Sequence, residues 1–147
     1  MITISQKCQY ALRALYELAQ RAEDKPTSIG EIAAAQTIPP RFLELIVNEL
    51  RQGKLVNSQR GPRGGYTLAR EPSKITVGDV VRLMEGPIEV VKCISGGDDC
   101  PLRNKCVFLE TWTQAGQAMQ NVFDSTTLQN LLDRQPHVSL ESSSYAI

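Results

Sequence analysis

Apolar residues recur every three or four positions along the first half of the chain, a spacing that predicts amphipathic helices. The first predicted helix covers about residues 7–22 and is rich in good helix formers. A second, short helix over about 29–36 begins after Ser28, which forms a capping box with Glu31 three residues later. We therefore expect two helices, joined by a turn, in the first 36 residues.

A third apolar stripe follows the prolines Pro39 and Pro40 and ends near Gly53. A proline suits the first position of a helix, because its missing N–H would be unpaired there. A short helix, a break of three or four residues and a longer helix are typical of a helix-turn-helix. Many small helical proteins share this order, so the residues that follow it are needed to identify the domain.

Two short strand patterns follow, over residues 55–60 and 66–69, on either side of the turn sequence 61–65. They predict a β-hairpin with Arg60 and Arg63 beside a Gly-Pro tip. Glycines let the backbone approach phosphates closely, and arginines are attracted to the negative potential of a narrow minor groove. This hairpin has the features of a DNA-binding wing.

The second half of the chain predicts three more helices. The first covers about 76–85, with Ser73 as a candidate N-cap, and irregular residues 88–107 follow it. A long helix with a broad apolar face is expected over 108–124, and a short closing helix over 126–132.

The predicted fold class is mainly α with a small β-hairpin wing: a winged helix-turn-helix plus a long dimerisation helix. We expect a DNA-binding domain over 1–72 and dimerisation helices over 73–134, with a cysteine-containing sensor loop at 88–107. Residues 135–147 are polar and serine-rich, as in a flexible tail.

The charge distribution supports this division. The 147 residues contain 16 basic and 16 acidic side chains. Residues 1–70 hold ten Lys/Arg and six Asp/Glu, whereas residues 71–147 hold six and ten. Residues 51–70 contain five basic side chains and no acidic one. This asymmetry indicates an N-terminal half that meets a polyanion, although a solvated basic loop would show it too.

Composition excludes several classes of protein. The 41% hydrophobic and 22% charged content is ordinary for a globular protein. No run approaches the roughly 20 apolar residues of a membrane span. The N-terminus lacks a basic start and an apolar signal core, so we expect a cytoplasmic protein with no membrane partner.

Three of the four cysteines, Cys93, Cys100 and Cys106, lie in a C-x6-C-x5-C pattern within the irregular segment. Thiolates bind soft metal centres, and the glycines of this segment would let three of them converge. A zinc site and a redox-switching disulfide between Cys93 and Cys100 remain alternatives, as do inert cysteines. A secreted disulfide framework is not expected without an export signal.

Six blocks of sequence resemble the IscR/NsrR/CymR family of bacterial regulators, over about residues 1–133. Members are homodimeric winged helix-turn-helix transcription regulators, and many carry an iron–sulfur cluster held by three cysteines. The wing block is the most specific. The blocks are Tyr10-Ala11-Leu12-Arg13-Ala14-Leu15, Phe42-Leu43-Glu44, Leu55-Val56, Arg60-Gly61-Pro62-Arg63-Gly64-Gly65-Tyr66-Thr67-Leu68, Ile75-Thr76-Val77-Gly78-Asp79-Val80 and Glu85-Gly86-Pro87.

The resemblance implies that the helix starting near Pro39 enters the major groove. Glu44 would accept a hydrogen bond from cytosine N4, Arg60 would reach the minor groove, and Arg41 would set operator preference. The alternative for Arg41 and Glu44 is a surface ion pair three residues apart. The candidate DNA-binding residues are Ser28, Pro39, Pro40, Arg41, Glu44, Arg51, Arg60, Arg63, Gly64, Gly65 and Tyr66.

The resemblance also assigns Cys93, Cys100 and Cys106 to the cysteine-containing, iron–sulfur branch, with [2Fe–2S] favoured over [4Fe–4S]. A conventional iron–sulfur cluster has four protein ligands, so three thiolates leave one ligand to be supplied by another residue. Leu109 stands where family members often have a histidine ligand, and leucine cannot bind iron.

Other residues are candidates for the missing ligand. Some family members supply it from the N-terminal helix of the partner subunit, at a position matched here by Gln9. Its neighbour Cys8 is a candidate fourth thiolate, or else a half-buried helix residue or a reactive thiol. Asp98 and Asp99 are weaker candidates, and His137 is expected to be solvated in the tail.

The leading hypothesis is a dimeric regulator, more specifically a repressor, that binds an imperfect palindrome in double-stranded DNA and is controlled by an iron–sulfur cluster. One alternative is a cofactor-free regulator controlled by thiol oxidation or by a protein partner. A remote alternative is a small iron–sulfur electron carrier. We expect no enzyme, because the chain lacks a Ser/His/Asp set and a phosphate-binding glycine loop.

Overall fold

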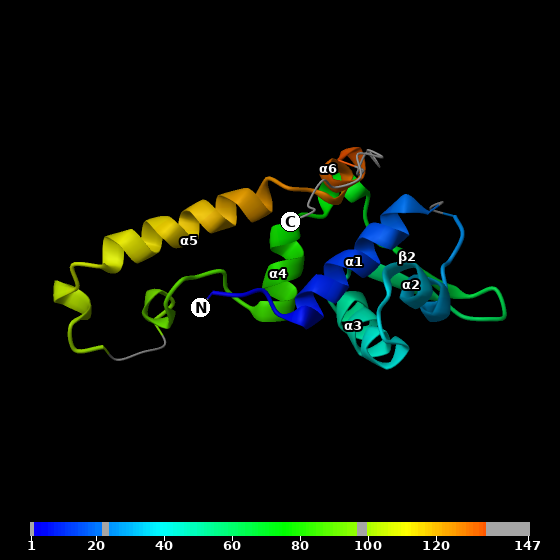
Figure 1. The fold of residues 1–147 in the computed structure, drawn as a ribbon, viewed down its shortest axis with the longest axis horizontal. Coiled ribbons are helices and arrows are strands. Elements are labelled where there is room, and N and C mark those ends of the chain that lie inside the picture. Colours follow the sequence, from blue (N-terminus) through cyan, green and yellow to red (C-terminus); the bar gives the residue numbers. More distant parts are fainter. Residues whose placement is uncertain (1, 22–23, 97–99, 135–147) are drawn as a thin grey trace, which may run out of the picture.

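The computed structural model describes residues 2–21, 24–96 and 100–134. It is mostly helical with one antiparallel hairpin, as predicted (Figure 1). The helices are α1 (Gln6–Gln20), α2 (Ile29–Gln36), α3 (Pro40–Gln52), α4 (Val77–Glu85), α5 (Leu109–Asp124) and α6 (Leu128–Asp133). The strands are β1 (Val56–Gln59) and β2 (Gly65–Leu68), and short 3-10 turns are η1 (Pro72–Lys74), η2 (Lys92–Ile94) and η3 (Arg103–Lys105).

Helix α1 lies at the centre of the hydrophobic core, packed against α2, α3, α4 and α6. Its inward residues include Ala11 and Leu15, both without exposed surface. The same core takes in Leu43 of α3, Val80 of α4 and Leu128 of α6. It therefore extends across the predicted division at residue 72, and that division stays a prediction.

The helix-turn-helix forms as its capping signals predict. Ser28 N–H donates to Glu31 Oε2 at 2.9 Å, and Glu31 N–H donates to Ser28 Oγ at 3.2 Å, which starts α2. Helix α2 ends at Thr37, whose left-handed backbone (φ 53°) turns the chain toward α3. Pro40 is the first residue of α3, where a missing N–H costs no hydrogen bond.

The wing is attached to the core by a third extended segment. Strands β1 and β2 pair from Val56 opposite Leu68 to Gln59 opposite Gly65. Thr27 and Tyr66 then exchange two backbone hydrogen bonds of 3.0 and 2.9 Å. At Gly65 (φ 155°), a Cβ atom would lie 2.5 Å from the Thr27 carbonyl oxygen, so only glycine fits this contact. The start of β2, next to the turn of the hairpin, is thereby fixed to the α1–α2 connection.

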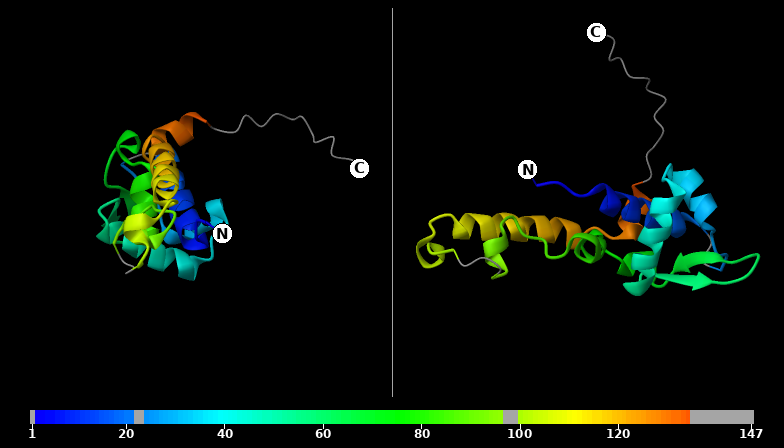
Figure 2. Two further views of the ribbon diagram at one scale, coloured as in Figure 1. Left: turned by 90° about the vertical axis from the view of Figure 1, so that its left-hand side faces the viewer. Right: turned by 90° about the horizontal axis from the view of Figure 1, so that it is seen from below.

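Helix α5 projects away from the rest of the molecule, at the end opposite the wing (Figures 1 and 2). Gly116 is its only buried residue, and it lies against the backbone of residues 88–90. Large apolar side chains at its two ends stay in solvent: Phe108 is 59% exposed and Val122 is 61% exposed. Met119 and Phe123 pack against the core, so the apolar face predicted for this helix is only partly covered within one chain.

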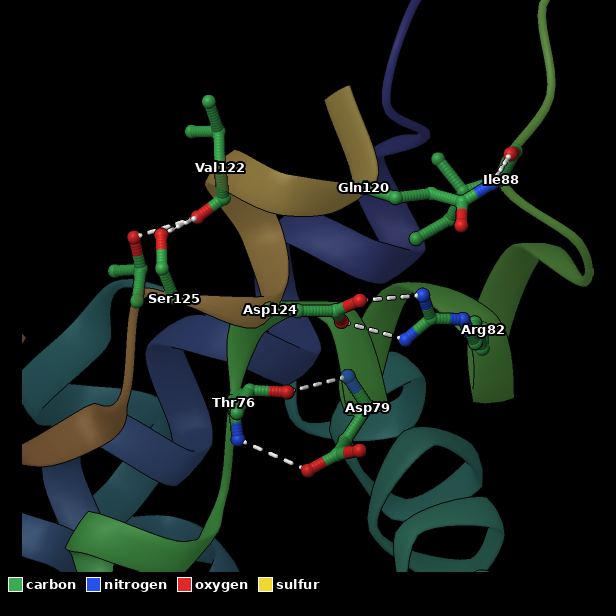
Figure 3. A network of polar contacts seen from close by, with 9 residues as sticks. Thr76, Asp79, Arg82, Ile88, Gln120, Val122, Asp124 and Ser125 are labelled. Atoms are coloured by element: carbon green, nitrogen blue, oxygen red, sulfur yellow. Dashed lines mark hydrogen bonds and ion pairs between the residues drawn. The ribbon is translucent and has the colours of Figure 1, made fainter. Parts of the chain in front are cut away.

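The C-terminal end of α5 is attached to α4 by a polar network (Figure 3). The Arg82 guanidinium donates to both carboxylate oxygens of Asp124, at 2.6 and 2.8 Å. Gln120 Nε2 donates to the Ile88 carbonyl at 2.7 Å. The Asp124 carboxylate also lies against Gly78 in the first turn of α4, in the space that a Cβ atom would need. These contacts fix the direction in which α5 leaves the core.

Two expectations about helix ends need correction. Ser73 does not cap α4, because it lies within the turn η1; Thr76 has the extended backbone of an N-cap, and its Oγ1 accepts from Asp79 N–H at 3.0 Å. The first helix ends at Gln20, before the predicted residue 22. The predicted tail at 135–147 lies outside the described residues. Within those residues, no helix combines the length and apolar character needed to cross a lipid bilayer.

We predict that Gly78→Ala destabilises the protein by about 1–3 kcal/mol, because the new methyl group overlaps the Asp124 carboxylate. Gly30→Ala is a matched control, since Gly30 is also the second residue of a helix but its Cβ would meet only Ser28 Oγ, at an ordinary contact distance of 3.9 Å. The control should be neutral or stabilise by about 0.4–1 kcal/mol. Urea unfolding measures both, and equal effects would contradict the proposed overlap.

The pair of Arg82 and Asp124 should also make stability depend on pH. Hydrogen bonds from Arg82 lower the pKa of Asp124 below its ordinary value of 3.8, so the pair stabilises the fold above that value and the contribution is lost as pH falls through the lowered pKa. Because both side chains are partly exposed, we expect under about 1 kcal/mol. Asp124→Asn should be less stable than the wild type at pH 7, and urea unfolding should show this difference shrinking as the pH falls below 3.8. A pH-independent difference would contradict this.

Candidate nucleic-acid interface and cysteine segment

Helix α3 presents a polar face that is separate from its buried face. Leu43, Ile46, Val47 and Leu50 enter the core. Arg41, Glu44, Asn48 and Arg51 are exposed and follow one another at three- or four-residue spacing, so they form a single stripe along the helix. The stripe contains two of the candidate base-reading residues, Arg41 and Glu44.

The basic residues near this stripe are not neutralised by carboxylates. Among the residues that the structure describes, the ion pairs are Lys7–Glu49, Arg21–Glu17 and Arg82–Asp124. The alternative ion pair between Arg41 and Glu44 does not form. Arg41, Arg51, Arg60 and Arg63 thus keep their charge available for an external anion.

The wing lies beside the last turns of α3. Arg60 and Arg63 are exposed near its tip, which is closed by a hydrogen bond of 2.9 Å from Gly64 N–H to the Gly61 carbonyl. A Cβ atom at Gly64 would overlap the Gln59 carbonyl, so this glycine is required by the turn. An open cavity of about 430 Å³ separates the wing from α3, and we call it the helix–wing notch.

The remaining candidate DNA-binding residues have clear local roles. Ser28 is engaged in its capping box, and its hydrogen bonds lower the pKa of Glu31. Pro39 and Pro40 are exposed at the start of α3, and Tyr66 is half-buried near the start of β2. Their contacts with DNA stay predictions.

Sequence reasoning missed Asn48. Its Oδ1 accepts a hydrogen bond of 2.9 Å from Arg51 Nη2, so one member of the polar stripe orients another. The spacing of four residues from Glu44 was the available signal, because it places Asn48 on the same helix face.

In the cysteine segment (residues 88–107), the described residues 88–96 and 100–107 contain two short 3-10 turns as their regular structure. Cys93 and Cys106 are half-buried, Cys100 is exposed, and all four cysteines of the chain are free thiols. The described residues do not bring three or more His, Cys, Asp or Glu side chains together as a metal site. Leu109 is the first residue of α5, whereas Asp98, Asp99 and His137 lie outside the described residues.

Cys8 differs from the other cysteines because it belongs to the core. Its side chain has no exposed surface, and Ser5 Oγ accepts from its backbone N–H at 3.1 Å as the cap of α1. Burial, with a smaller effect of the Glu85 charge, raises the pKa of Cys8 to about 11. Of the alternatives that the sequence left open for Cys8, the half-buried helix position is replaced by full burial, which disfavours a thiolate. Its role as a fourth ligand stays a prediction.

Comparison with known proteins assigns this arrangement to a family. A family model for Rrf2, an iron-dependent transcriptional regulator, matches residues 4–134. The regulator CymR of Bacillus subtilis is 40% identical over 128 residues, covering 87% of this chain and 88% of CymR. The regulator IscR of Yersinia pseudotuberculosis is 30% identical over 132 residues, covering 90% of this chain and 80% of IscR.

Solved structures agree with the sequence relatives. The structure of CymR, the global cysteine regulator of B. subtilis, aligns with a TM-score of 0.74 and 38% identity over 90% of this chain and 98% of CymR. The structure of T. potens IscR aligns with a TM-score of 0.73 and 35% identity over 90% and 87% of the two chains. The predicted winged-helix fold and the prediction that the protein is not an enzyme are confirmed. The chain therefore belongs to the Rrf2 family of transcriptional regulators.

Proposed function

We propose that the protein is a cytoplasmic, homodimeric repressor that binds an imperfect palindrome in double-stranded DNA. The observation that supports DNA binding most is the set of arginines on α3 and the wing that have no carboxylate partner among the described residues. Phosphates attract such charges, and the exposed stripe of α3 offers Arg41 and Glu44 to base edges in the major groove. Arg60 and Arg63 would enter the adjacent minor groove.

The uncovered face of α5 supports dimerisation. Phe108, just before α5, and Val122 within it remain more than half exposed, on a helix with one buried residue. A second copy that pairs its α5 with this face would bury them. A two-fold axis there would relate two copies of α3, which is why we expect a palindromic operator.

The cysteine segment would supply the sensor. Cys93, Cys100 and Cys106 form a soft donor set on a segment with little regular structure, so their chemistry fits an iron–sulfur cluster, with [2Fe–2S] favoured. The family description as iron-dependent and the likeness to IscR support this reading. When bound, the cluster would supply redox and iron sensitivity. Residues 88–90 pass against α5 at Gly116, so a change in this segment would reach the proposed dimer helix.

A second candidate is regulation linked to cysteine or thiol state without a cluster. The higher identity to CymR, whose solved structure is named as that of a global cysteine regulator, supports it. Leu109 cannot bind iron, Cys8 is buried, and Cys100 is an exposed thiol open to oxidation. Both candidates keep the same DNA-binding surface and differ in the chemistry of the cysteine segment.

We predict that Arg60→Ala weakens DNA binding and lowers the slope of log affinity against log salt by about one phosphate equivalent. The probe is a duplex selected by the wild-type protein from a random-sequence library, and fluorescence anisotropy at several KCl concentrations gives the slope. Lys74→Ala is the control, since Lys74 is exposed on η1, outside α3 and the wing. If Arg60→Ala matches the wild type across all salt concentrations, Arg60 has no role in binding.

We further predict that anaerobic purification yields a coloured protein with bound iron and sulfide, and that Cys106→Ser loses most of both. Iron and sulfide analysis with visible absorption measures the outcome. Cys8→Ala tests the fourth ligand, because an unchanged Mössbauer spectrum would remove Cys8 from the ligand set. A colourless, iron-free wild type whose DNA binding responds to thiol oxidation would favour the second candidate.

A further inference from the structure

The helix–wing notch lies between the last turns of α3 and the wing. Asn48 and Arg51 line it from α3. Arg60, Gln59 and Tyr66 line it from the wing, together with glycines that contribute only backbone atoms. The result is an open, polar cavity of about 430 Å³ with a wall on each of two elements.

The charge of the notch favours an anion. Two arginines, Arg51 and Arg60, are among the residues that line it, and no acidic residue is. Neither arginine has an ion-pair partner among the described residues. The neutral polar groups beside them, such as Gln59, can bind water or a second oxygen of the same anion. A singly charged group with several oxygens therefore suits the cavity.

Arg51 is held in place before any anion binds. Asn48, three residues earlier on the same helix face, accepts from Arg51 Nη2 at 2.9 Å. This contact uses one of the five N–H donors of the guanidinium and leaves the others available. It also restricts a long side chain that would otherwise sample many rotamers, so less freedom is lost on binding.

The position of the notch indicates the anion. If α3 enters the major groove and the wing enters the adjacent minor groove, as proposed above, one sugar–phosphate strand runs between them, because such a strand separates neighbouring grooves of the duplex. We propose that the notch binds one phosphate of that strand, with Arg51 as its charged partner and Asn48 as the positioning residue for Arg51. This inference rests on the proposed DNA-binding function and specifies the site at which the protein binds the DNA backbone.

A scan with uncharged phosphates tests the contact directly. The selected duplex is prepared with a single methylphosphonate at each successive position. For the wild type, we expect one position per half-site, between the major-groove and minor-groove contacts, at which affinity falls about ten-fold. Arg51→Ala should bind the unmodified duplex more weakly and lose no further affinity at that position.

The role of Asn48 is tested by a double-mutant cycle. Asn48→Ala should weaken binding in the wild-type background but not in the Arg51→Ala background, because it acts through Arg51. Its melting temperature should match that of the wild type, which excludes a general loss of stability. If Asn48→Ala instead relaxes the preference at one base pair in a repeated selection, Asn48 reads a base and its positioning role is overturned.

Arg70→Ala is the matched control, since Arg70 is exposed on the same domain but lines a different cavity, beside α1. It should leave the methylphosphonate profile unchanged. A profile in which no position depends on Arg51, while Arg60→Ala still weakens binding, overturns the notch and leaves the proposed function intact. A wild-type protein that enriches no duplex from the library overturns both.

Discussion

Burial of the apolar face of α1 is the constraint on which the rest of the structure depends. Four helices pack on α1, and they include α3 of the DNA-binding face and α4, which leads into the cysteine segment. Ala11 and Leu15 of α1 have no exposed surface, so a shift of α3 or α4 relative to α1 would open the close-packed core. The recognition surface and the base of the sensor region are therefore positioned by the same hydrophobic contact.

The two exposed helices use their surfaces in opposite ways. Helix α3 buries an apolar stripe and exposes a polar one, as a helix that reads DNA at the edge of a folded domain must. Helix α5 has one buried residue and leaves apolar side chains in solvent. The apolar stripe of α3 is covered by neighbouring elements of the same chain. Part of the apolar surface of α5 is not covered by its own chain.

Local signals explain what the sequence could predict. The capping box of Ser28 and Glu31, the proline at the start of α3 and the glycines of the wing act within a few residues, so each could be recognised without the fold. The family resemblance then predicted the order in which these elements follow one another along the chain. The position of the candidate reading residues on one exposed face of α3 then followed from helical periodicity.

Contacts between distant residues explain what the sequence could not predict. The carboxylate of Asp124 against Gly78 and Arg82 joins positions more than 40 residues apart. The cap of α4 fell on Thr76 rather than Ser73 because η1 takes up the preceding residues. Full burial of Cys8 depends on how α1 packs, which the spacing of the cysteines does not encode.

The backbone pairing of Thr27 with Tyr66 has a consequence for how the wing loses its order. An isolated hairpin of two four-residue strands is only marginally stable. The wing is therefore stabilised by its pairing with the buried Thr27, which lies between α1 and α2 in the chain. Wing and helix-turn-helix should then open as one cooperative unit, with similar hydrogen-exchange protection in β2 and in the α1–α2 connection. A substitution that loosens this connection would disorder the wing from a distance, without changing any residue of the hairpin.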